Sequence, residues 1–503
     1  MNYLSQLITI MIKHGSSSLL VNKAVIKPIP KNKQKSLANS NNYRAISKNS
    51  IISKIIDHIV LILIGDKLST SCYQFAYKKC FSTSLCSFLV SETIQYYRAR
   101  GSNVYMLSLD ATKGFDKVQY SKLFDLLIER DICPLIIRLL ISIYSVSSAI
   151  VSWSNVKSDS FEINNGVKQG AVISPPLFGL YINPLLIKLQ ESNQGCFMGN
   201  ICANAFAYAD DVVILAPSCT ALESLISICE VYAKEYNVCF NPDKCTLLIY
   251  ANDDFYFNNL NIFICGVKVK KLKSETHLGH VFKSSYNLID FQNIIRDLKV
   301  RTNVILSQFS CLTWHAKVKL FLSQCSSLYG SPLWNLDDPN IDVLCTAWKV
   351  CCRRILNIKP DSRSELLHHV MNTLPIKDMI MSRQLSFMMS GIKHDSSTIA
   401  SFFSNSLLSN TSFMTKNVNI ILKHLNLDYG YLFSNANKAR TKSLFYNNMN
   451  KPDWRSNLLR ELLDLKEYIS FCDFMKESEI IDTLNRTEIL DILDDISRSR
   501  IYP

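Results

Sequence analysis

Short apolar segments of this chain carry aspartates at places where a β-strand would end or turn. The run from Val104 to Leu109 leads directly into Asp110, and two further apolar runs are separated by Asp210 and Asp211. Runs of roughly four to eight apolar residues are typical of buried strands, whereas aspartate is disfavoured in strands and in cores. Carboxylates that are flanked by aliphatic residues do not serve solubility. The pattern therefore restricts the chain to folds in which a sheet places acidic side chains together at a functional site.

The close approach of such carboxylates predicts a cation-binding site. Bringing two or three carboxylates together costs several kcal/mol of repulsion and desolvation unless a cation neutralises them, and hard divalent metals prefer oxygen ligands. Mg²⁺ is the default candidate, and two such ions would activate an attacking hydroxyl and stabilise a leaving phosphate. Simpler roles stay open for each motif alone: a helix cap or turn for Asp110, and a polar turn for Asp210 with Asp211.

The excess of positive charge is concentrated near the N-terminus. The chain has 55 Lys and Arg against 42 Asp and Glu, which gives a net charge of +13. The first 50 residues contain no acid and eight basic residues: Lys13, Lys23, Lys27, Lys31, Lys33, Lys35, Arg44 and Lys48. This asymmetry indicates a polyanionic partner, either nucleic acid or an anionic membrane surface, although a solvated basic face explains it equally well.

The charged fraction of 19% is below the roughly 25% of ordinary soluble domains and calls for a search for membrane spans. The most apolar stretch, residues 51–64, is interrupted by charged residues and is shorter than the ~20 residues of a span. The N-terminal apolar run precedes its positive charges and lacks a cleavage site, so we expect no secretory signal. The 17 cysteines are mostly scattered singly, which predicts buried thiols. With neither a span nor a secretory signal, we expect an intracellular protein, of the cytoplasm and nucleus, that is neither secreted nor membrane-bound.

Hydrophobic periodicity predicts a mixed α+β body followed by helices. The expected elements are a hairpin in residues 21–50, helices at 51–68, 83–98, 119–128, 135–144, 175–189 and 221–236, and strands at 104–109, 146–163, 205–208 and 212–215. A further strand is expected to end near Tyr250, and a short strand pair is expected within 262–282. Beyond about residue 288 the pattern is almost wholly helical, with a core stripe of Leu344, Trp348, Cys351 and Ile355. The Ser- and Asn-rich residues 395–418 predict a connector, and residues 451–503 predict terminal helices.

Further motifs surround the aspartates in a definite order. Upstream of Asp110 they are Val25–Lys31, Asn42–Ser47 and Gln74–Lys78; downstream they are Phe115-Asp116, Gly166-Val167-Lys168-Gln169-Gly170, Ser174-Pro175-Pro176-Leu177-Phe178, Tyr208-Ala209-Asp210-Asp211, Asn241-Pro242-Asp243-Lys244 and Leu278-Gly279. In this order they closely resemble the reverse-transcriptase domain of non-LTR retrotransposons of the jockey and chicken-repeat-1 kind. The resemblance covers roughly residues 20–285, and the segment Tyr329–Trp334 with the helical part of the chain resembles the family's thumb and post-polymerase region.

The resemblance implies an α+β right-hand polymerase fold, in which fingers and a palm with an antiparallel sheet are followed by an α-helical thumb-like domain. On this basis we expect the N-terminal part of the fingers in residues 1–100 and the palm with the remaining fingers in residues 101–285. A helical thumb-like domain is expected in residues 286–395, and a connector with a helical C-terminal tail in residues 396–503.

The resemblance also implies roles for the acidic and aromatic residues. The counterparts of Asp110, Asp210 and Asp211 surround two Mg²⁺ ions in the family, with Mn²⁺ as a possible substitute, which agrees with the cation site inferred from the carboxylates. Phe115 matches the aromatic residue that lies under the sugar of the incoming nucleotide. A flat ring there clashes with a 2′-hydroxyl and selects deoxynucleotides, whereas the simpler interpretation of Phe115 is a core aromatic.

Further matching residues concern the incoming nucleotide. Gln169 and Gly170 match the loop whose backbone approaches the nucleotide and template, where a Cβ would obstruct. Lys244 matches a lysine suspected of protonating the departing pyrophosphate, although a surface charge is the simpler interpretation. Lys31 and Arg44 match the fingers hairpin, where cations can clamp the triphosphate, and a solvated basic face remains the alternative.

The resemblance therefore implies an RNA-directed DNA polymerase that extends a primer 3′-OH with dNTPs on an RNA template. Its partners would be an RNA template, a DNA primer and dNTPs, held through phosphates and shape without reading sequence. Ala45, Gly114, Lys168 and Pro184 stand where the family has Pro, Ala, Pro and Asp. These departures suggest a divergent copy, so the alternative is a weak or inactive reverse-transcriptase remnant that binds RNA without turnover.

Overall fold

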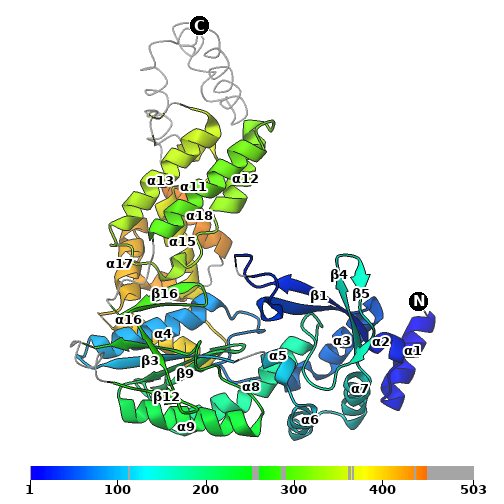
Figure 1. Cartoon of the computed structure of the whole chain (residues 1–503). Helices are drawn as coiled ribbons and strands as arrows, with labels where there is room; N and C mark the ends of the chain where they lie inside the picture. The colour runs from blue at the N-terminus through cyan, green and yellow to red at the C-terminus, as the bar shows by residue number, and fades with distance from the viewer. Residues whose placement is uncertain are drawn as a thin grey trace, which may run out of the picture. The chain divides into compact units, whose positions relative to one another are not determined.

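The structure is a computed structural model of the chain (Figure 1). It describes residues 2–34, 36–111, 114–251, 260–284, 291–358, 360, 364, 367–409, 411–434 and 438–449. The chain forms two compact units. The first contains residues 1–278 with 282–287, and the second contains residues 279–281 with 288–503.

A five-stranded central sheet forms the core of the first unit. Its strands lie in the order β14 (Lys270–Leu272), β11 (Thr246–Tyr250), β3 (Val104–Asp110), β10 (Asp211–Ala216) and β9 (Ala205–Tyr208). The pairs β11·β3, β3·β10 and β10·β9 are antiparallel, whereas β14 pairs with β11 in parallel. Strand β3 lies in the middle and is buried on both faces as far as Leu109, which explains why its residues are apolar apart from Ser108.

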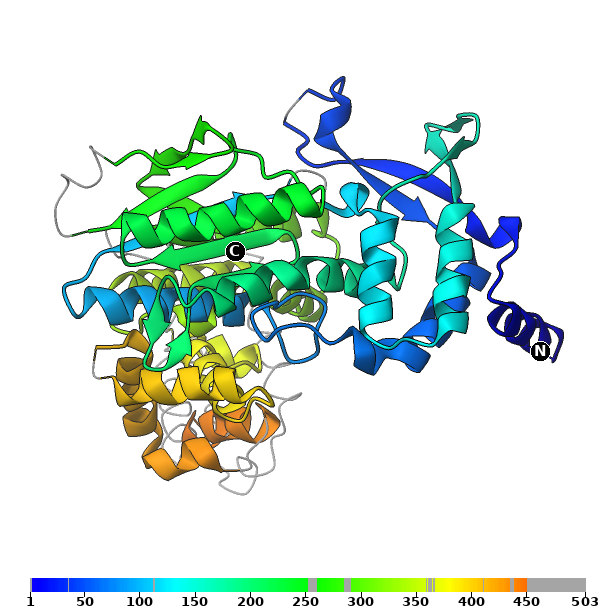
Figure 2. The ribbon, with the colours of Figure 1, turned by 90° about the horizontal axis from the view of Figure 1, so that it is seen from below.

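Helices cover both faces of this central sheet. Helix α4 (Thr83–Arg98) lies on one face, and α8 (Ser174–Glu191) and α9 (Cys219–Glu235) lie on the other (Figures 1 and 2). Leu107 and Ile214, which are register partners, share one core with residues of α8 and α9. The residues that alternate with these in β3 and β10 therefore face α4. Asp110 belongs to this set that faces α4.

A second sheet contains the hairpin expected in residues 21–50. Strand β1 (Lys23–Pro30) pairs antiparallel with β2 (Tyr43–Lys48) and parallel with β4 (Ser148–Trp153), and β4 pairs with β5 (Val156–Lys157) and β6 (Phe161–Glu162). The rings of Tyr43 and Trp153 meet edge to face at 5.0 Å across the sheet. The predicted hairpin is confirmed, and its strands are joined to a strand more than a hundred residues further along the chain.

Short helices and strands complete the first unit. The helices are α1 (Asn2–His14), α2 (Leu19–Asn22), η1 (Ser40–Asn42), α3 (Ile51–Ile64), η2 (Gly65–Leu68), α5 (Gly114–Lys117), α6 (Tyr120–Glu129) and α7 (Pro134–Ser145). The strands are β7 (Phe197–Met198), β8 (Ile201–Cys202), β12 (Phe263–Ile264), β13 (Val267–Lys268), β15 (Ser274–His277) and β16 (His280–Lys283). The first two residues of β16 belong to the second unit. Helix α1 packs against α7, and α6 packs against both α7 and α8.

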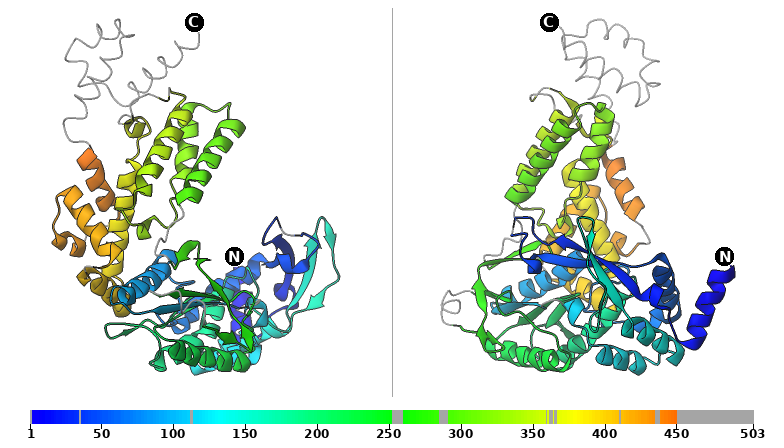
Figure 3. Two further views of the ribbon diagram at one scale, coloured as in Figure 1. Left: turned by 60° about the vertical axis from the view of Figure 1, so that its left-hand side comes forward. Right: turned by 45° about the vertical axis from the view of Figure 1, so that its right-hand side comes forward.

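The second unit is helical, as the sequence predicts beyond residue 288. Helices α11 (Phe291–Gln308), α12 (Trp314–Cys325) and α13 (Asn340–Leu356) pack together, and α15 (Ile376–Ile392) contacts α16 (Ser397–Leu408), α17 (Phe413–Leu425) and α18 (Lys438–Met449) (Figure 3). The shorter elements are η3 (Ser331–Leu333), α14 (Leu367–Val370) and η4 (Tyr429–Phe433). The predicted stripe of Leu344, Trp348, Cys351 and Ile355 is buried, which confirms its assignment to the core.

Residues 397–425 differ from the connector expected there, because they form α16 and α17 and pack on α15. Phe402 and Phe403 are fully buried. The Oγ of Ser412 accepts a hydrogen bond from the backbone N–H of Met414 and caps α17. The serines that suggested a loop therefore serve as caps and buried hydrogen-bonding groups. The terminal helices predicted in residues 451–503 lie outside the described residues.

Two further expectations from the sequence concern membrane-spanning helices and the cysteine side chains. Within the residues that the structure describes, no helix is both long and apolar enough to span a bilayer. The cysteines in those residues are unpaired thiols, and burial raises the pKa of several of them, including Cys86, Cys196 and Cys229. Buried thiols of this kind behave as small apolar side chains. The prediction of buried thiols is wrong for five others, which are exposed: Cys80, Cys133, Cys239, Cys265 and Cys311.

Candidate active site

The register of the central sheet brings the predicted aspartates to one end of it. Asp110, the last residue of β3, is the register partner of Asp211, the first residue of β10. Tyr208 of β9 pairs with the same Asp211, so Ala209 and Asp210 form the tight link between β9 and β10. A shift by one residue would send Asp110 and Asp211 to the opposite face of the sheet. Burial of the alternating apolar residues therefore fixes where these carboxylates lie.

The carboxylates influence one another electrostatically. Burial raises the pKa of the Asp210 carboxyl, the charge of Asp110 adds to this rise, and Lys244 and Arg44 oppose it. Burial and then repulsion from Asp210 and Asp110 raise the pKa of Asp211 to about 6, although Asp211 keeps an exposed surface. Like charges that are held together favour proton uptake or the binding of a cation.

Lys244 supplies the nearest positive charge. Its Nζ lies 2.7 Å from Oδ1 of Asp110. The turn that carries Lys244 is attached to the end of β3, because the N–H of Asn241 donates to the backbone oxygen of Asp110 at 2.9 Å and Phe240 forms a bridge with Ala111. The structure thus brings together two of the predicted catalytic residues. The ion pair is partly exposed at both ends, and such pairs contribute at most about 1 kcal/mol.

The donor set fits a hard divalent cation in its chemistry. It consists of carboxylate oxygens whose repulsion is only partly compensated, which is the arrangement that oxygen-preferring metals relieve. Across the described part of the chain, no three His, Cys, Asp or Glu side chains are already gathered as a metal-ligand group. Asp110 is instead engaged by Lys244. A bound cation would therefore compete with Lys244 for the Asp110 carboxylate.

Phe115 lies on the short helix α5 next to the aspartates. Its ring stacks on Phe178 at 4.4 Å and meets Tyr77 edge to face at 6.4 Å. A Cβ added to the neighbouring Gly114 would lie 3.0 Å from the Phe178 ring and 3.6 Å from Cβ of Asp210. Glycine in place of the family's alanine thus allows α5 to pack closely against the Phe178 ring. Phe115 is half-buried and packs against the core, so its ring is supported on one side.

The Gln169-Gly170 loop is attached to the hairpin. The backbone oxygen of Gln169 accepts a hydrogen bond from the N–H of Ser47 on β2 at 2.7 Å. Gly170 has φ of +116°, and an added Cβ would lie 2.6 Å from the backbone oxygen of Ser47. Preceding this loop, Lys168 is buried and donates to the backbone oxygen of Asn22 at 3.0 Å. The lysine that replaces the family's proline therefore points into the protein.

The two predicted triphosphate-binding cations differ in their surroundings. Arg44, exposed on β2, lies close enough to lower the pKa of Asp210. The Nζ of Lys31 donates instead to the backbone oxygen of Asn41 at 3.2 Å, at the tip of the hairpin. Arg44 is thus electrostatically connected to the aspartates, whereas Lys31 is held within the hairpin itself.

Three residues at this site have no role in the sequence-based prediction. Gln74 bonds to the backbone of Ala209, and the Tyr77 hydroxyl is near enough to Asp210 and Asp211 for their charges to add to the burial that raises its pKa. Glu275 is half-buried on β15, and its charge contributes to the raised pKa of Asp211. Gln74 and Tyr77 belong to a motif that the sequence does show, whereas Glu275 carries no sequence signal.

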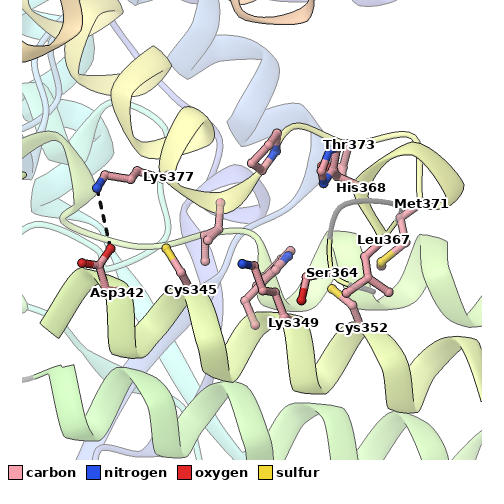
Figure 4. Close-up of a pocket in the computed structure, with 13 residues that line it drawn as sticks. Asp342, Cys345, Lys349, Cys352, Ser364, Leu367, His368, Met371, Thr373 and Lys377 are labelled. Carbon is pink, nitrogen blue, oxygen red and sulfur yellow. Dashed lines mark ion pairs between the residues drawn. The ribbon is translucent and has the colours of Figure 1, made fainter. Parts of the chain in front are cut away.

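A separate cavity of about 280 Å³ lies in the helical unit (Figure 4). It is bounded by α13 and by the segment from Ser364 to Lys377, and its lining includes Trp348, Met371 and Ile376. At one edge, Nζ of Lys377 lies 3.6 Å from Oδ1 of Asp342. Its lining includes no predicted site residue, so we do not connect it with the aspartates.

The family assignment rests on the first unit. Residues 29–282 match the family described as reverse transcriptase (RNA-dependent DNA polymerase), which is half of the chain. The chain therefore belongs to the reverse-transcriptase family, and its α+β architecture is the polymerase fold expected from the sequence.

Curated relatives specify the kind of reverse transcriptase. The chain is 28% identical over 236 residues to the Pol polyprotein of the R2 retrotransposable element of Nasonia vitripennis, covering 47% of this chain and 22% of that protein. It is 26% identical over 253 residues to a 149 kDa protein of the transposon TX1 of Xenopus laevis, covering 48% and 19%. The chain thus spans about a fifth of the relatives that it matches. These matches confirm the resemblance to the reverse-transcriptase domain of non-LTR retrotransposons.

Solved telomerase structures are more distant neighbours. The apo telomerase of Candida tropicalis has a TM-score of 0.43 and 13% identity, covering 88% of this chain and 72% of that chain. Telomerase of Candida albicans in complex with a fragment of telomeric RNA has a TM-score of 0.39 and 10% identity, covering 85% and 66%.

Proposed function

We propose that the chain is the RNA-directed DNA polymerase part of a non-LTR retrotransposon, acting at the site of Asp110, Asp210 and Asp211. The observation that carries this proposal is the register of β3 against β10, which gathers the predicted aspartates at one end of a buried sheet. In the proposed reaction the primer 3′-oxygen forms a bond to the α-phosphate of a dNTP. The bond from that phosphorus to the bridging oxygen breaks, and pyrophosphate leaves.

Divalent metal is general to reverse transcriptases, and the three aspartates are the residues that would hold it. Two Mg²⁺ ions, or Mn²⁺ in their place, would favour loss of the primer hydroxyl proton and would stabilise charge on the leaving phosphate. Lys244 would hold a proton beside Asp110 and deliver it to the departing pyrophosphate. Arg44 and Lys31 would attract the triphosphate, and the loop at Gln169 and Gly170 would approach the nucleotide.

The domain roles follow the same proposal. Residues 1–100 and part of 101–285 would serve as fingers, the central sheet as palm, residues 286–395 as a thumb-like domain and residues 396–503 as an appended helical part. The RNA template and DNA primer would be held through phosphates by distributed lysines and arginines. We propose an intracellular location, in the cytoplasm and nucleus, where such a template and primer are available.

Primer extension tests the proposal directly. The purified chain, given a DNA primer annealed to an RNA template, dNTPs and Mg²⁺, is expected to lengthen the primer, and chelation with EDTA is expected to stop extension. Extension that continues under chelation would contradict the assignment of the aspartates to metal.

A remnant that binds RNA without turnover is the second candidate. The observation that favours it is the departure from the family's motifs at Ala45, Gly114, Lys168 and Pro184. Absence of extension in Mg²⁺ and in Mn²⁺, together with RNA binding that weakens steeply with salt, would favour this alternative.

Replacement of Phe115 by alanine is expected to admit ribonucleotides. Removing the ring stacked on Phe178 opens space where a 2′-hydroxyl would otherwise clash. The preference for dNTP over rNTP, measured as the ratio of kcat/KM, should fall by about 10- to 100-fold, equivalent to about 1.4–2.7 kcal/mol. Phe124→Ala is the control, because Phe124 lies among Tyr120 and Tyr144 in a separate aromatic group. An unchanged ratio in Phe115→Ala would show that Phe115 serves only the core.

A further inference from the structure

The link between β9 and β10 has an unusual backbone conformation at Ala209. Its φ is +58°, in the left-handed region, where residues with a Cβ are disfavoured and glycine is usual. Ala209 directly precedes Asp210, and both lie between the paired residues Tyr208 and Asp211. The direction in which Asp210 leaves the turn therefore depends on Ala209 keeping this conformation.

The side chain of Gln74 binds both polar groups of Ala209. Its Oε1 accepts from the N–H of Ala209 at 2.9 Å, and its Nε2 donates to the backbone oxygen of Ala209 at 3.3 Å. Oε1 also accepts from the N–H of Ala76 at 3.1 Å, so the orientation of the amide is determined by two N–H donors. Gln74 is fully buried, and Ala209 is buried as well. Water therefore has little access to replace these hydrogen bonds.

Gln74 is itself held by the backbone. The N–H of Phe75 donates to the oxygen of Ala207 at 2.8 Å, and the N–H of Ala207 donates to the oxygen of Tyr73 at 2.9 Å. These bonds form a parallel bridge between Gln74 and Ala207 beside β9. The buried rings of Phe75 and Phe206 lie 6.3 Å apart and pack the two segments together. Gln74 thus reaches the turn from a rigid support.

We propose that Gln74 is a positioning residue for Asp210, which holds the Ala209 turn in the left-handed conformation that the aspartate needs. This inference rests on the proposed polymerase function. Loss of the side-chain amide would leave the N–H and the C=O of Ala209 buried without partners and would allow the turn to relax. The carboxylate of Asp210 would then move with it, and a displacement of about 1 Å is enough to cost roughly 10²-fold in rate.

Gln74→Met tests this proposal, because methionine keeps the length of the side chain and removes both hydrogen bonds to Ala209. We expect kcat for primer extension to fall by about 10- to 100-fold, with KM for dNTP changed less than about threefold. Mn²⁺ binding, measured by electron paramagnetic resonance with the metal alone, should weaken by about tenfold. Gln190→Met is the matched control, because Gln190 also donates a side-chain hydrogen bond, to Ser71 at 3.1 Å, away from the turn.

Ala209→Gly provides the rescue. Glycine adopts a positive φ without penalty, so in the Gln74→Met background it should restore kcat and Mn²⁺ affinity to within about fivefold of the original chain. It also lowers the risk that Gln74→Met fails to fold. Full activity of Gln74→Met, or a loss that Ala209→Gly does not restore, would overturn the proposal.

Amide hydrogen exchange of residues 205–216 separates this inference from the proposed function. Exchange at the turn should increase by about tenfold or more in Gln74→Met and return toward the original rate when Ala209→Gly is added. This measurement requires no catalysis. If the original chain neither extends primers nor binds Mn²⁺, the proposed function fails. In that case unchanged exchange in Gln74→Met would overturn the proposal that Gln74 holds the Ala209 turn. Increased exchange would show that Gln74 holds the turn, but only as part of the fold.

Discussion

Replacement of Asp210 by asparagine is expected to abolish RNA-templated primer extension, with kcat reduced by at least about 10³-fold, or about 4 kcal/mol in activation free energy. Asp210 lies in the tight link between β9 and β10, beside the paired Asp110 and Asp211. Asparagine keeps its shape and removes the negative charge that a divalent cation requires. Steady-state extension of a DNA primer on an RNA template measures the effect.

The same substitution should leave the protein folded. Burial and the charge of Asp110 both raise the pKa of Asp210, so its ionised form destabilises the folded state and a neutral side chain removes that penalty. The free energy of unfolding should therefore stay equal or increase at neutral pH. Asp243→Asn is the matched control, since Asp243 is an exposed aspartate in the turn that carries Lys244. Equal extension by the Asp210 and Asp243 variants would remove Asp210 from the catalytic set.

Replacement of Gly170 by alanine is the second large effect expected. Its φ of +116° disfavours any residue with a Cβ, and the added carbon would lie 2.6 Å from the backbone oxygen of Ser47. That oxygen belongs to β2 and cannot rotate away as a flexible side chain could. We expect the free energy of unfolding to fall by about 3 kcal/mol, or the loop to leave β2 and KM for dNTP to rise by about tenfold.

Gly101→Ala separates the two causes of the effect expected for Gly170→Ala, which are the positive φ and the contact with Ser47. Gly101 also has a positive φ, of +75°, but an added Cβ there would meet nothing within 4 Å. It should therefore cost only about 1 kcal/mol, with KM for dNTP unchanged. Urea unfolding and KM for dNTP are measured on both variants. If both variants lose the same stability and keep the same KM, the contact between Gly170 and Ser47 has no importance for the site.

Much of the fold could be predicted because its signals are local. The apolar run of β3, in which only Ser108 is polar before Asp110, predicts a buried strand, and the helical spacing of Trp348 and its stripe predicts a core. The connector expected in residues 395–418 shows the limit of such signals. Serine favours loops and also caps helices, so composition could not distinguish the two until the burial of Phe402 and Phe403 was known.

The candidate site divides in the same way. The identity of the acidic residues and the order of the motifs are visible in the sequence, since carboxylates inside apolar strands need a compensating charge. The sequence does not show where the Lys168 side chain lies, because only the packed structure shows that this lysine is buried against Asn22. Lys168, which replaces the proline of the family's motif, thus has a hydrogen-bond partner that no local sequence pattern reveals.

The sequence by itself determined the acids Asp110, Asp210 and Asp211, the strands that carry them and the family to which the chain belongs. Only the tertiary structure decided which groups complete the site. Lys244 reaches Asp110 across 134 residues, and Gln74 reaches the Ala209 turn across 135. The physical reason is that strand and helix periodicity depend on neighbouring residues, whereas these polar contacts depend on sheet register and on the path of the chain between distant segments.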